Sequence, residues 1–312
     1  MHFLLSRLAH LLLIAALLAA CSSTPIKTDF PPVSSSPSDT AAQAPTASKR
    51  SPKIGLALGG GAARGFAHVG VIAALEEAGI KVDYVVGTSA GSLVGAIYAS
   101  GKNAAQLQEV ALKMEEAEIT DWTLPFGNRG ILRGQALSDY VNRQVNNKLI
   151  ESLPVPFGVV ATDLKSGQGV LFQRGDTGMA VRASSAVPSI FTPVNIGGRE
   201  YVDGGLVAPV PVRYAKQMGA ELVIAVDISS APEGNNSDGT IAVLLQTFAI
   251  MGKSINEYAL VGADVVVRPE LVGVKGGDFT AKRRAIDAGK LAMQRAMPAL
   301  KAAIEAKSRV VP

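Results

Sequence analysis

The chain has 312 residues, of which 48% are hydrophobic and 18% are charged, and its formal net charge is +4 at pH 7. This length fits a single α/β enzyme domain of about 250 residues with an additional tail. The charge is too mild to indicate nucleic-acid binding, and the sequence has neither a basic stripe nor interleaved aromatic residues. The single cysteine excludes an internal disulfide and a cysteine metal cluster.

The first twenty residues have the layout of a secretory signal peptide, with Arg7 before an apolar run at 11–18 and small residues before Cys21. The apolar run is much shorter than the roughly 20 residues of a membrane-spanning helix. Leu18-Ala19-Ala20-Cys21 resembles the lipobox of bacterial lipoproteins, which implies that Cys21 becomes the lipid-carrying first residue of the mature chain. An ordinary cleavable signal followed by an unmodified thiol is the alternative.

The residues after Cys21 predict the membrane in which the protein is anchored and a tether between the anchor and the folded domain. In lipoproteins of enterobacteria an Asp at the next position favours inner-membrane retention, whereas this chain has Ser22. The resemblance implies a protein of the bacterial cell envelope, lipid-anchored to the outer membrane and facing the periplasm. Residues 21–51 are rich in Ser, Pro, Thr and Ala without apolar periodicity, which predicts a disordered tether. The expected organisation is a signal peptide at 1–20, this tether, and a hydrolase domain at 52–312.

From about residue 53 onwards, short apolar runs alternate with helical patterns. In chain order, we expect a strand at 54–58, a helix with apolar residues from Phe66 to Leu75 that Gly79 closes, a strand at 82–86, helices at 92–99, 104–117 and 135–146, strands at 157–162, 170–172, 201–202 and 222–227, a helical stripe at 241–255, a strand at 265–268, and a terminal helix at about 286–304. Pro298 is expected to kink or split that last helix. Such alternation predicts a layered α/β domain with a largely parallel sheet.

The most informative segment is Gly87-Thr88-Ser89-Ala90-Gly91, which follows an expected strand and precedes an expected helix. This context is that of a nucleophile elbow. Small residues let the backbone turn sharply and present the Ser89 hydroxyl at the edge of the sheet, in front of the partly positive N-terminus of the helix. The alternative is a strand-to-helix turn that merely needs glycine.

A serine hydroxyl needs an adjacent base. His2 and His10 lie in the expected signal peptide, and His68 lies on a helix where a structural role is favoured. We therefore expect a carboxylate, and Tyr201-Val202-Asp203-Gly204-Gly205 offers Asp203 at the end of a short strand. A free aspartate of pKa about 4 is a poor base, so burial or a hydrogen bond must assist it. An aspartate that only forms a turn is the alternative.

The turn from Leu58 to Gly65 is expected to supply backbone N–H donors for a developing oxyanion. Within Gly59, Gly60 and Gly61, the last two are the favoured donors. Arg64 is expected to support the loop or to face lipid phosphate. A phosphate-binding turn of the dinucleotide type is the alternative, but Arg64 stands where a third glycine is needed, and no Lys-Ser or Lys-Thr pair follows.

Four blocks in this order, Gly59–Gly65, Gly87–Gly91, Ala183–Pro188 and Asp203–Gly205, resemble those of the patatin-like phospholipases over residues 53–228. The branch that the chain most resembles is the bacterial group related to the catalytic domain of neuropathy target esterase. The resemblance implies a three-layer αβα sandwich with a largely parallel central sheet, hydrolysis of acyl esters, and no metal or organic cofactor.

The resemblance also implies roles for single residues. Ser89 and Asp203 would form a catalytic dyad, and the glycine-rich loop would form the oxyanion hole. The remaining motif residues, which would support the site, are Gly87, Gly91, Pro188, Gly204 and Gly205.

The expected substrate is a membrane phospholipid or lysophospholipid. Trp122, Leu124 and Phe126 lie on a loop that would form an apolar lip towards a bilayer or an acyl chain, or would simply pack over the domain. The competing function is a lipoprotein that binds or carries lipid without catalysis. Acyl transfer to an acceptor other than water would use the same dyad.

Overall fold

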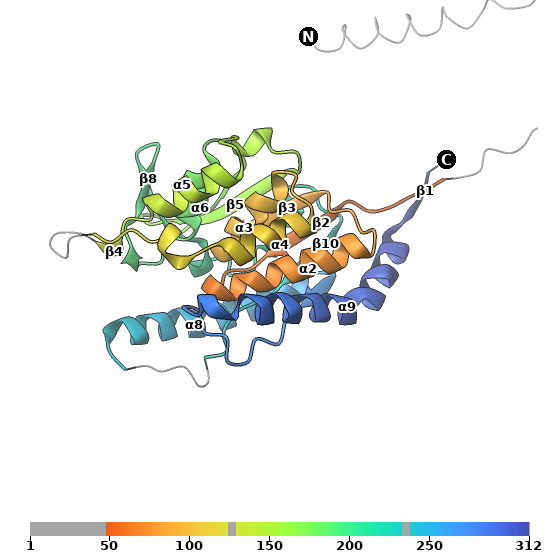
Figure 1. Ribbon diagram of the computed structural model, residues 1–312. Coiled ribbons are helices and arrows are strands. Elements are labelled where there is room, and N and C mark those ends of the chain that lie inside the picture. The colour runs from red at the N-terminus through yellow and green to blue at the C-terminus, as the bar shows by residue number, and fades with distance from the viewer. Residues whose placement is uncertain (1–47, 124–128, 233–237, 312) are drawn as a thin grey trace, which may run out of the picture. The chain divides into compact units, whose positions relative to one another are not determined.

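The computed structural model describes residues 48–123, 129–232 and 238–311. In these residues the central sheet has eight strands. Seven follow the order β11-β10-β2-β3-β5-β9-β8, and β6 pairs with β5 along the edge opposite to β3 and β9 (Figure 1). These strands are β2 (Ile54–Leu58), β3 (Tyr84–Thr88), β5 (Phe157–Asp163), β6 (Gly169–Phe172), β8 (Val194–Ile196), β9 (Arg199–Asp203), β10 (Leu222–Val226) and β11 (Val265–Val267). Strands β11, β10, β2, β3 and β5 run parallel, whereas β6 and β9 run antiparallel to β5.

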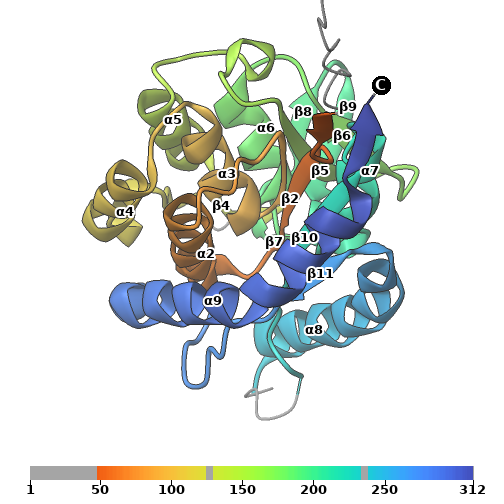
Figure 2. The same cartoon turned by 90° about the vertical axis from the view of Figure 1, so that its right-hand side faces the viewer.

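Helices cover both faces of this sheet. The described helices are α2 (Phe66–Glu77), α3 (Ala90–Ala99), α4 (Ala104–Lys113), α5 (Gln135–Gln144), α6 (Thr177–Ser184), α7 (Val212–Gln217), α8 (Thr240–Ala259) and α9 (Lys282–Lys307). Figure 2 shows α2 and α3 on one side of β2 and β10, and α7 on the other. The expected three-layer αβα sandwich with a largely parallel sheet is confirmed.

The central strands are buried along their whole length because each face of the sheet has its own core. In β2, Leu56 and Leu58 pack with α2, α3 and α9, whereas Ala57 points to the opposite core with residues of α7. Successive side chains of a strand point to opposite faces, so a strand between two helical layers is apolar at every position. For this reason the apolar runs in the sequence predicted the bounds of β2, β5 and β10 to within one residue.

Several boundaries differ from the expected ones. The expected strand at 82–86 is β3 at Tyr84–Thr88, because Gly87 and Thr88 continue the pairing with β2 and β5. The short helices α6 and α7 were not expected. The terminal helix α9 contains Pro298 without a break in the helix, and Figures 1 and 2 both show that α9 bends along its length. A bend is what a proline inside a helix produces.

The ends of the described chain lie together. Strand β1 (Ser48–Arg50) pairs antiparallel with β12 (Arg309–Val311). Residues 1–20, Cys21 and the expected tether up to residue 47 lie outside the described residues. All described residues belong to one compact unit. Within the described ranges, no helix combines the length and the apolar composition needed to cross a membrane.

Candidate active site

Ser89 stands at the junction of β3 and α3, at the carboxyl edge of the parallel strands. Its backbone has φ 52° and ψ −124°, a conformation that is unfavourable for a residue with a side chain. Such strain persists only where the surrounding structure imposes it, and it is the mark of a nucleophile elbow. The turn exposes part of Ser89 and places it before the N-terminus of α3.

The glycines of the elbow allow backbone segments to approach closely. A Cβ on Gly87 would lie 2.4 Å from the Gly91 carbonyl oxygen, and one on Gly91 would lie 2.2 Å from the Leu58 carbonyl oxygen. Real Cβ atoms cannot occupy such positions, so only glycine fits at both. The two motif glycines thus bring the start of α3 against the end of β2.

The sheet register brings Asp203 to the level of Ser89. In β3, Thr88 is paired with Val160 of β5, and the next residue of β5, Ala161, is paired with Asp203 of β9. β6 pairs with one edge of β5, so β3 and β9 follow each other along the opposite edge, and Ser89 and Asp203 lie next to each other at the point where β3 ends and β9 begins its pairing. The Ser89 side chain is close enough to the Asp203 carboxylate to favour its ionised form.

The Asp203 carboxyl is held in a nearly dry environment, with the residue only 7% exposed. Burial raises its pKa from 3.8 to about 6, although the hydrogen bond from the Gly205 N–H and the neighbouring Ser89 side chain act in the opposite direction. The Gly205 nitrogen lies 2.6 Å from Asp203 Oδ1. At Gly204, a Cβ would lie 2.1 Å from the Val160 carbonyl oxygen, so this turn also needs a glycine.

The glycine-rich loop lies against the candidate nucleophile, since a Cβ on Gly60 would be 3.2 Å from Ser89 Cβ. Two of its expected donors are already engaged. The Gly59 N–H donates to the Val226 carbonyl at 3.1 Å, and the Gly60 N–H donates to the Pro209 carbonyl at 2.9 Å. The expectation that these two N–H groups are free to bind an oxyanion is therefore corrected.

The free donors of the loop lie one step further along the chain. Within the described residues, no acceptor pairs with the N–H of Gly61 or of Ala62. Ala62 has φ 49° and begins a 3₁₀ helix, Ala62–Gly65, that continues into α2. The first N–H groups of a helix have no partner within it and carry partial positive charge. Sequence reasoning missed Ala62 because it considered only the glycines of the loop as donors.

Arg64 and His68 support this loop. The Arg64 guanidinium donates to the Ser229 carbonyl, and burial lowers the pKa of Arg64. His68 is fully buried with Nε2 2.8 Å from the Gly59 carbonyl oxygen, and burial lowers its pKa to about 4. A neutral imidazole that donates to this carbonyl orients the start of the loop, in agreement with the structural role favoured for His68.

Ser184, which lies in the block Ala183–Pro188, holds the elbow. Its buried hydroxyl accepts from the Ser89 N–H at 2.8 Å and donates to the Val160 carbonyl at 2.5 Å. The same block contacts the other candidate residue, because the Asp203 N–H donates to the Ala186 carbonyl at 2.9 Å. Pro188 follows this block and is half-buried. The sequence signal was the block Ala183–Pro188 itself.

Of the expected apolar lip, only Trp122 is among the described residues. Trp122 is 74% exposed and forms a bridge with Leu132 of β4 (Gly130–Leu132), which pairs with β7 (Ser189–Phe191). Leu124 and Phe126 of the expected lip lie outside the described residues. In the described part of the chain, no three His, Cys, Asp or Glu side chains gather as a metal site would require.

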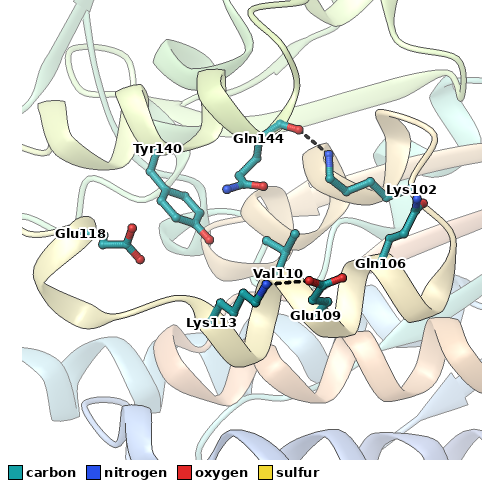
Figure 3. Close-up of a pocket in the computed structure, with 8 residues that line it drawn as sticks. All are labelled: Lys102, Gln106, Glu109, Val110, Lys113, Glu118, Tyr140 and Gln144. Atoms are coloured by element: carbon teal, nitrogen blue, oxygen red, sulfur yellow. Dashed lines mark hydrogen bonds and ion pairs between the residues drawn. The ribbon is translucent and has the colours of Figure 1, made fainter.

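A cavity of about 320 Å³ opens between α4 and α5 (Figure 3). Its charged lysines are partnered: Lys113 forms an ion pair with Glu109 at 2.6 Å, and Lys102 donates to the Gln144 carbonyl at 2.6 Å. Neither Ser89 nor any other candidate residue lines it. This cavity is separate from the candidate active site.

Comparison with known proteins agrees with this geometry. A family model described as patatin-like phospholipase matches residues 56–216, just over half of the chain. An uncharacterised NTE-family protein of Mycobacterium tuberculosis is 39% identical over 189 residues, which cover 60% of this chain and 52% of that protein. Patatin-like phospholipase domain-containing protein 6 of Homo sapiens is 33% identical over 230 residues, which cover 71% of this chain and 16% of that protein.

The crystal structure of VipD from Legionella pneumophila is similar in fold, with a TM-score of 0.55 and 14% identity over 79% of this chain and 67% of that one. The chain spans about half, or less, of the length of the curated relatives that it matches. The matched family region includes the glycine-rich loop, the elbow and Asp203. The chain therefore belongs to the patatin-like phospholipase family.

Proposed function

We propose that this chain is a serine hydrolase of lipid acyl esters, with Ser89 as nucleophile and Asp203 as general base. The observation that carries the proposal is the strained Ser89 beside the buried Asp203 carboxylate, whose pKa burial raises to about 6. A base is most effective when its pKa lies near the working pH. Near pH 7 such a carboxylate is still ionised, and it accepts a proton more readily than an ordinary aspartate.

The reaction proceeds in two steps. Ser89 Oγ attacks the ester carbonyl carbon while its proton passes to Asp203. The tetrahedral intermediate then collapses to an acyl-serine as the alcohol leaves with that proton. Water attacks the acyl-serine with Asp203 again as base, the fatty acid is released, and Ser89 regains its proton. The N–H groups of Gly61 and Ala62 stabilise the oxyanion formed in each step, and the helix N-terminus that they begin adds to this effect.

The proposed substrate is a phospholipid or a lysophospholipid. Membership of the patatin-like phospholipase family supports a lipid acyl ester. The residues around Ser89 supply what hydrolysis requires without a bound metal or organic cofactor, because nucleophile, base and oxyanion donors all come from the chain.

We also propose that the protein is lipid-anchored through Cys21 to the outer membrane, facing the periplasm. The support for this is the lipobox-like Leu18-Ala19-Ala20-Cys21 followed by Ser22. Metabolic labelling with an alkyne fatty acid in a bacterial host is expected to mark the wild-type chain, and fractionation is expected to place it in the outer membrane. An unlabelled wild-type chain, or a label that persists after Cys21→Ser, would exclude the anchor.

Fatty-acid release tests the enzymatic proposal. The full chain is incubated with phosphatidylcholine vesicles and with lysophosphatidylcholine, and free fatty acid is measured by mass spectrometry. Ser89→Ala is expected to reduce release to the uncatalysed background, and EDTA is expected to leave the wild-type rate unchanged. Release that continues in a folded Ser89→Ala protein would show that another group carries the reaction. If the wild type binds these lipids without hydrolysis, the lipid-binding lipoprotein becomes the better account.

A further inference from the structure

The N-terminal half of α8 is an apolar helix without a place in the core. From Thr240 to Gly252 the sequence contains no Asp, Glu, Lys or Arg. The buried residues of α8 are Gly252 and Asn256, and none of its side chains belongs to the described hydrophobic core clusters. Apart from Thr240, Gln246 and Thr247 the side chains of this N-terminal half are apolar, and a helix with apolar side chains on opposite sides is normally buried in protein or in lipid.

Large apolar side chains are exposed on opposite sides of this half-helix. Their exposed fractions range from 39% to 52%, and they are Ile241, Val243, Leu245, Ile250 and Met251. At about 100° per residue, Ile241 and Val243 point roughly 200° apart. The pair of Ile241 and Leu245 thus lies on one face, and the pair of Val243 and Ile250 lies on the other. Figure 1 shows the N-terminal part of α8 projecting past the end of α9.

The C-terminal half of α8 fixes this projection beside the candidate active site. A Cβ on Gly252 would contact Pro209 at 3.6 Å, and the Asn256 amide donates to Ser229 Oγ at 2.9 Å. The helix also contacts the 3₁₀ turn Gly204–Leu206, which follows Asp203 directly. Ser229 is the residue whose carbonyl binds Arg64 of the glycine-rich loop. The C-terminal half of α8 therefore anchors the helix beside the glycine-rich loop, and the helix as a whole contacts the turn that follows Asp203.

The exposure of apolar side chains on opposite sides of the helix indicates what covers the N-terminal half of α8. A second protein copy packs against one face of a helix and leaves the opposite face in water. Residues 241 and 243 point to opposite sides, so a single flat interface covers only one of them. Insertion into a lipid phase covers every side at once, as interfacial helices do when they sink roughly 5–10 Å into the boundary between headgroups and acyl chains.

We propose that residues 240–251 of α8 insert into the surface of a lipid bilayer and hold the Ser89–Asp203 edge of the sheet against it. The choice of lipid as occupant rests on the proposed function. The insertion itself is a property of α8 and does not require hydrolysis. Acyl chains would then reach Ser89 without passing through water, because the inserted segment adjoins the turn that bears Asp203.

Depth-dependent quenching tests the insertion. Cys21 is the only cysteine, so full-length protein with Cys21→Ser and Ser89→Ala accepts one new thiol for an environment-sensitive fluorophore. The test positions are Val243→Cys and Leu245→Cys, and the matched control is Leu291→Cys on α9, which is 47% exposed. Any membrane affinity of residues 1–20 is common to all three proteins. The Ser89→Ala background prevents hydrolysis, so failed insertion and failed catalysis give separate results.

With phosphatidylcholine vesicles, bromine on the acyl chains is expected to lower fluorescence about twofold at 243 and 245, because an inserted helix comes within reach of the chains. Position 291 is expected to stay unchanged. Equal quenching at all three positions, no quenching at 243 and 245, or a dimer that shields these two positions without lipid would each overturn the proposal.

A second measurement links insertion to substrate access in the active enzyme. Val243→Glu with Ile250→Glu places two charges on the inserted segment without touching the candidate catalytic groups. Hydrolysis of vesicle phospholipid is expected to fall at least about tenfold, because two apolar anchors are lost, whereas hydrolysis of a water-soluble short-chain ester stays unchanged. Leu291→Glu is expected to alter neither rate. Equal rates on vesicles for the double variant and the wild type would contradict the proposal.

Discussion

Asp203 is a carboxylate whose ionisation the fold opposes. Burial raises its pKa to about 6 from the ordinary 3.8, so between these values the folded protein binds a proton that the unfolded chain has released. The free energy of unfolding therefore falls as the pH rises through this window. By linkage, the ionised carboxylate lowers stability by about 0.5 kcal/mol at pH 4 and by about 3 kcal/mol at pH 7.5.

Asp203→Asn removes the charge and keeps an acceptor for the Gly205 N–H, which lies 2.6 Å from Oδ1. At pH 7.5 the variant is expected to be more stable than the wild type by about 1–3 kcal/mol, after about 1 kcal/mol is allowed for a weaker interaction with Ser89. At pH 4 the two proteins are expected to be nearly equally stable. The same variant is expected to lose about 10²–10⁴ in kcat/KM through loss of the general base.

Urea unfolding of both proteins at pH 4, 5, 6 and 7.5 measures this difference, because every other titrating group is common to the two chains. Ser89→Ala serves as the control, since it removes activity and keeps the buried carboxylate. Its stability is expected to fall with pH at least as steeply as that of the wild type. If Asp203→Asn is less stable than the wild type at pH 7.5, or if the difference is independent of pH, burial does not raise the pKa of Asp203.

Three further outcomes follow from the site. In a pH–rate profile with a soluble ester, kcat/KM is expected to fall about tenfold per unit below pH 6, because Asp203 becomes protonated; a break near pH 4 would contradict the raised pKa. Ser184→Ala leaves the Ser89 N–H unpaired, so a loss of about 1–3 kcal/mol in urea unfolding and a slower acylation are expected; an unchanged acylation rate would remove Ser184 from the elbow. His68→Leu is expected to lower stability by a similar amount, because the Gly59 carbonyl loses its donor, and to leave the pH at the break unchanged; a shifted break would mean that His68 takes part in proton transfer.

Much of the fold could be predicted because its strands are buried on both faces. The run Ile54–Leu58 has the same bounds in the sequence prediction and in β2. Ser89 and Asp203 could be named as candidates because the elbow and the Asp-Gly-Gly turn are local signals. Their approach depends on the antiparallel strand β9, whose register with β5 brings together residues 114 positions apart in the chain.

Other features depend on contacts that no local pattern contains. The N–H groups of Gly59 and Gly60 are engaged by Val226 and Pro209, which are distant in sequence, so the motif alone could not show which donors are free. The role of Ser184 depends likewise on its bond to the Ser89 N–H. In α8 the apolar periodicity predicted a helix correctly, but periodicity does not reveal whether protein or lipid covers the helix.

The central claim is that Ser89 is an activated nucleophile. Purified full-length wild type and Ser89→Ala are treated with a fluorophosphonate, digested, and analysed by mass spectrometry for the modified peptide. The account predicts a phosphonyl adduct on Ser89 of the wild type and no adduct in the variant. An adduct on another residue in both proteins, or none on Ser89 of folded wild-type protein, would contradict it.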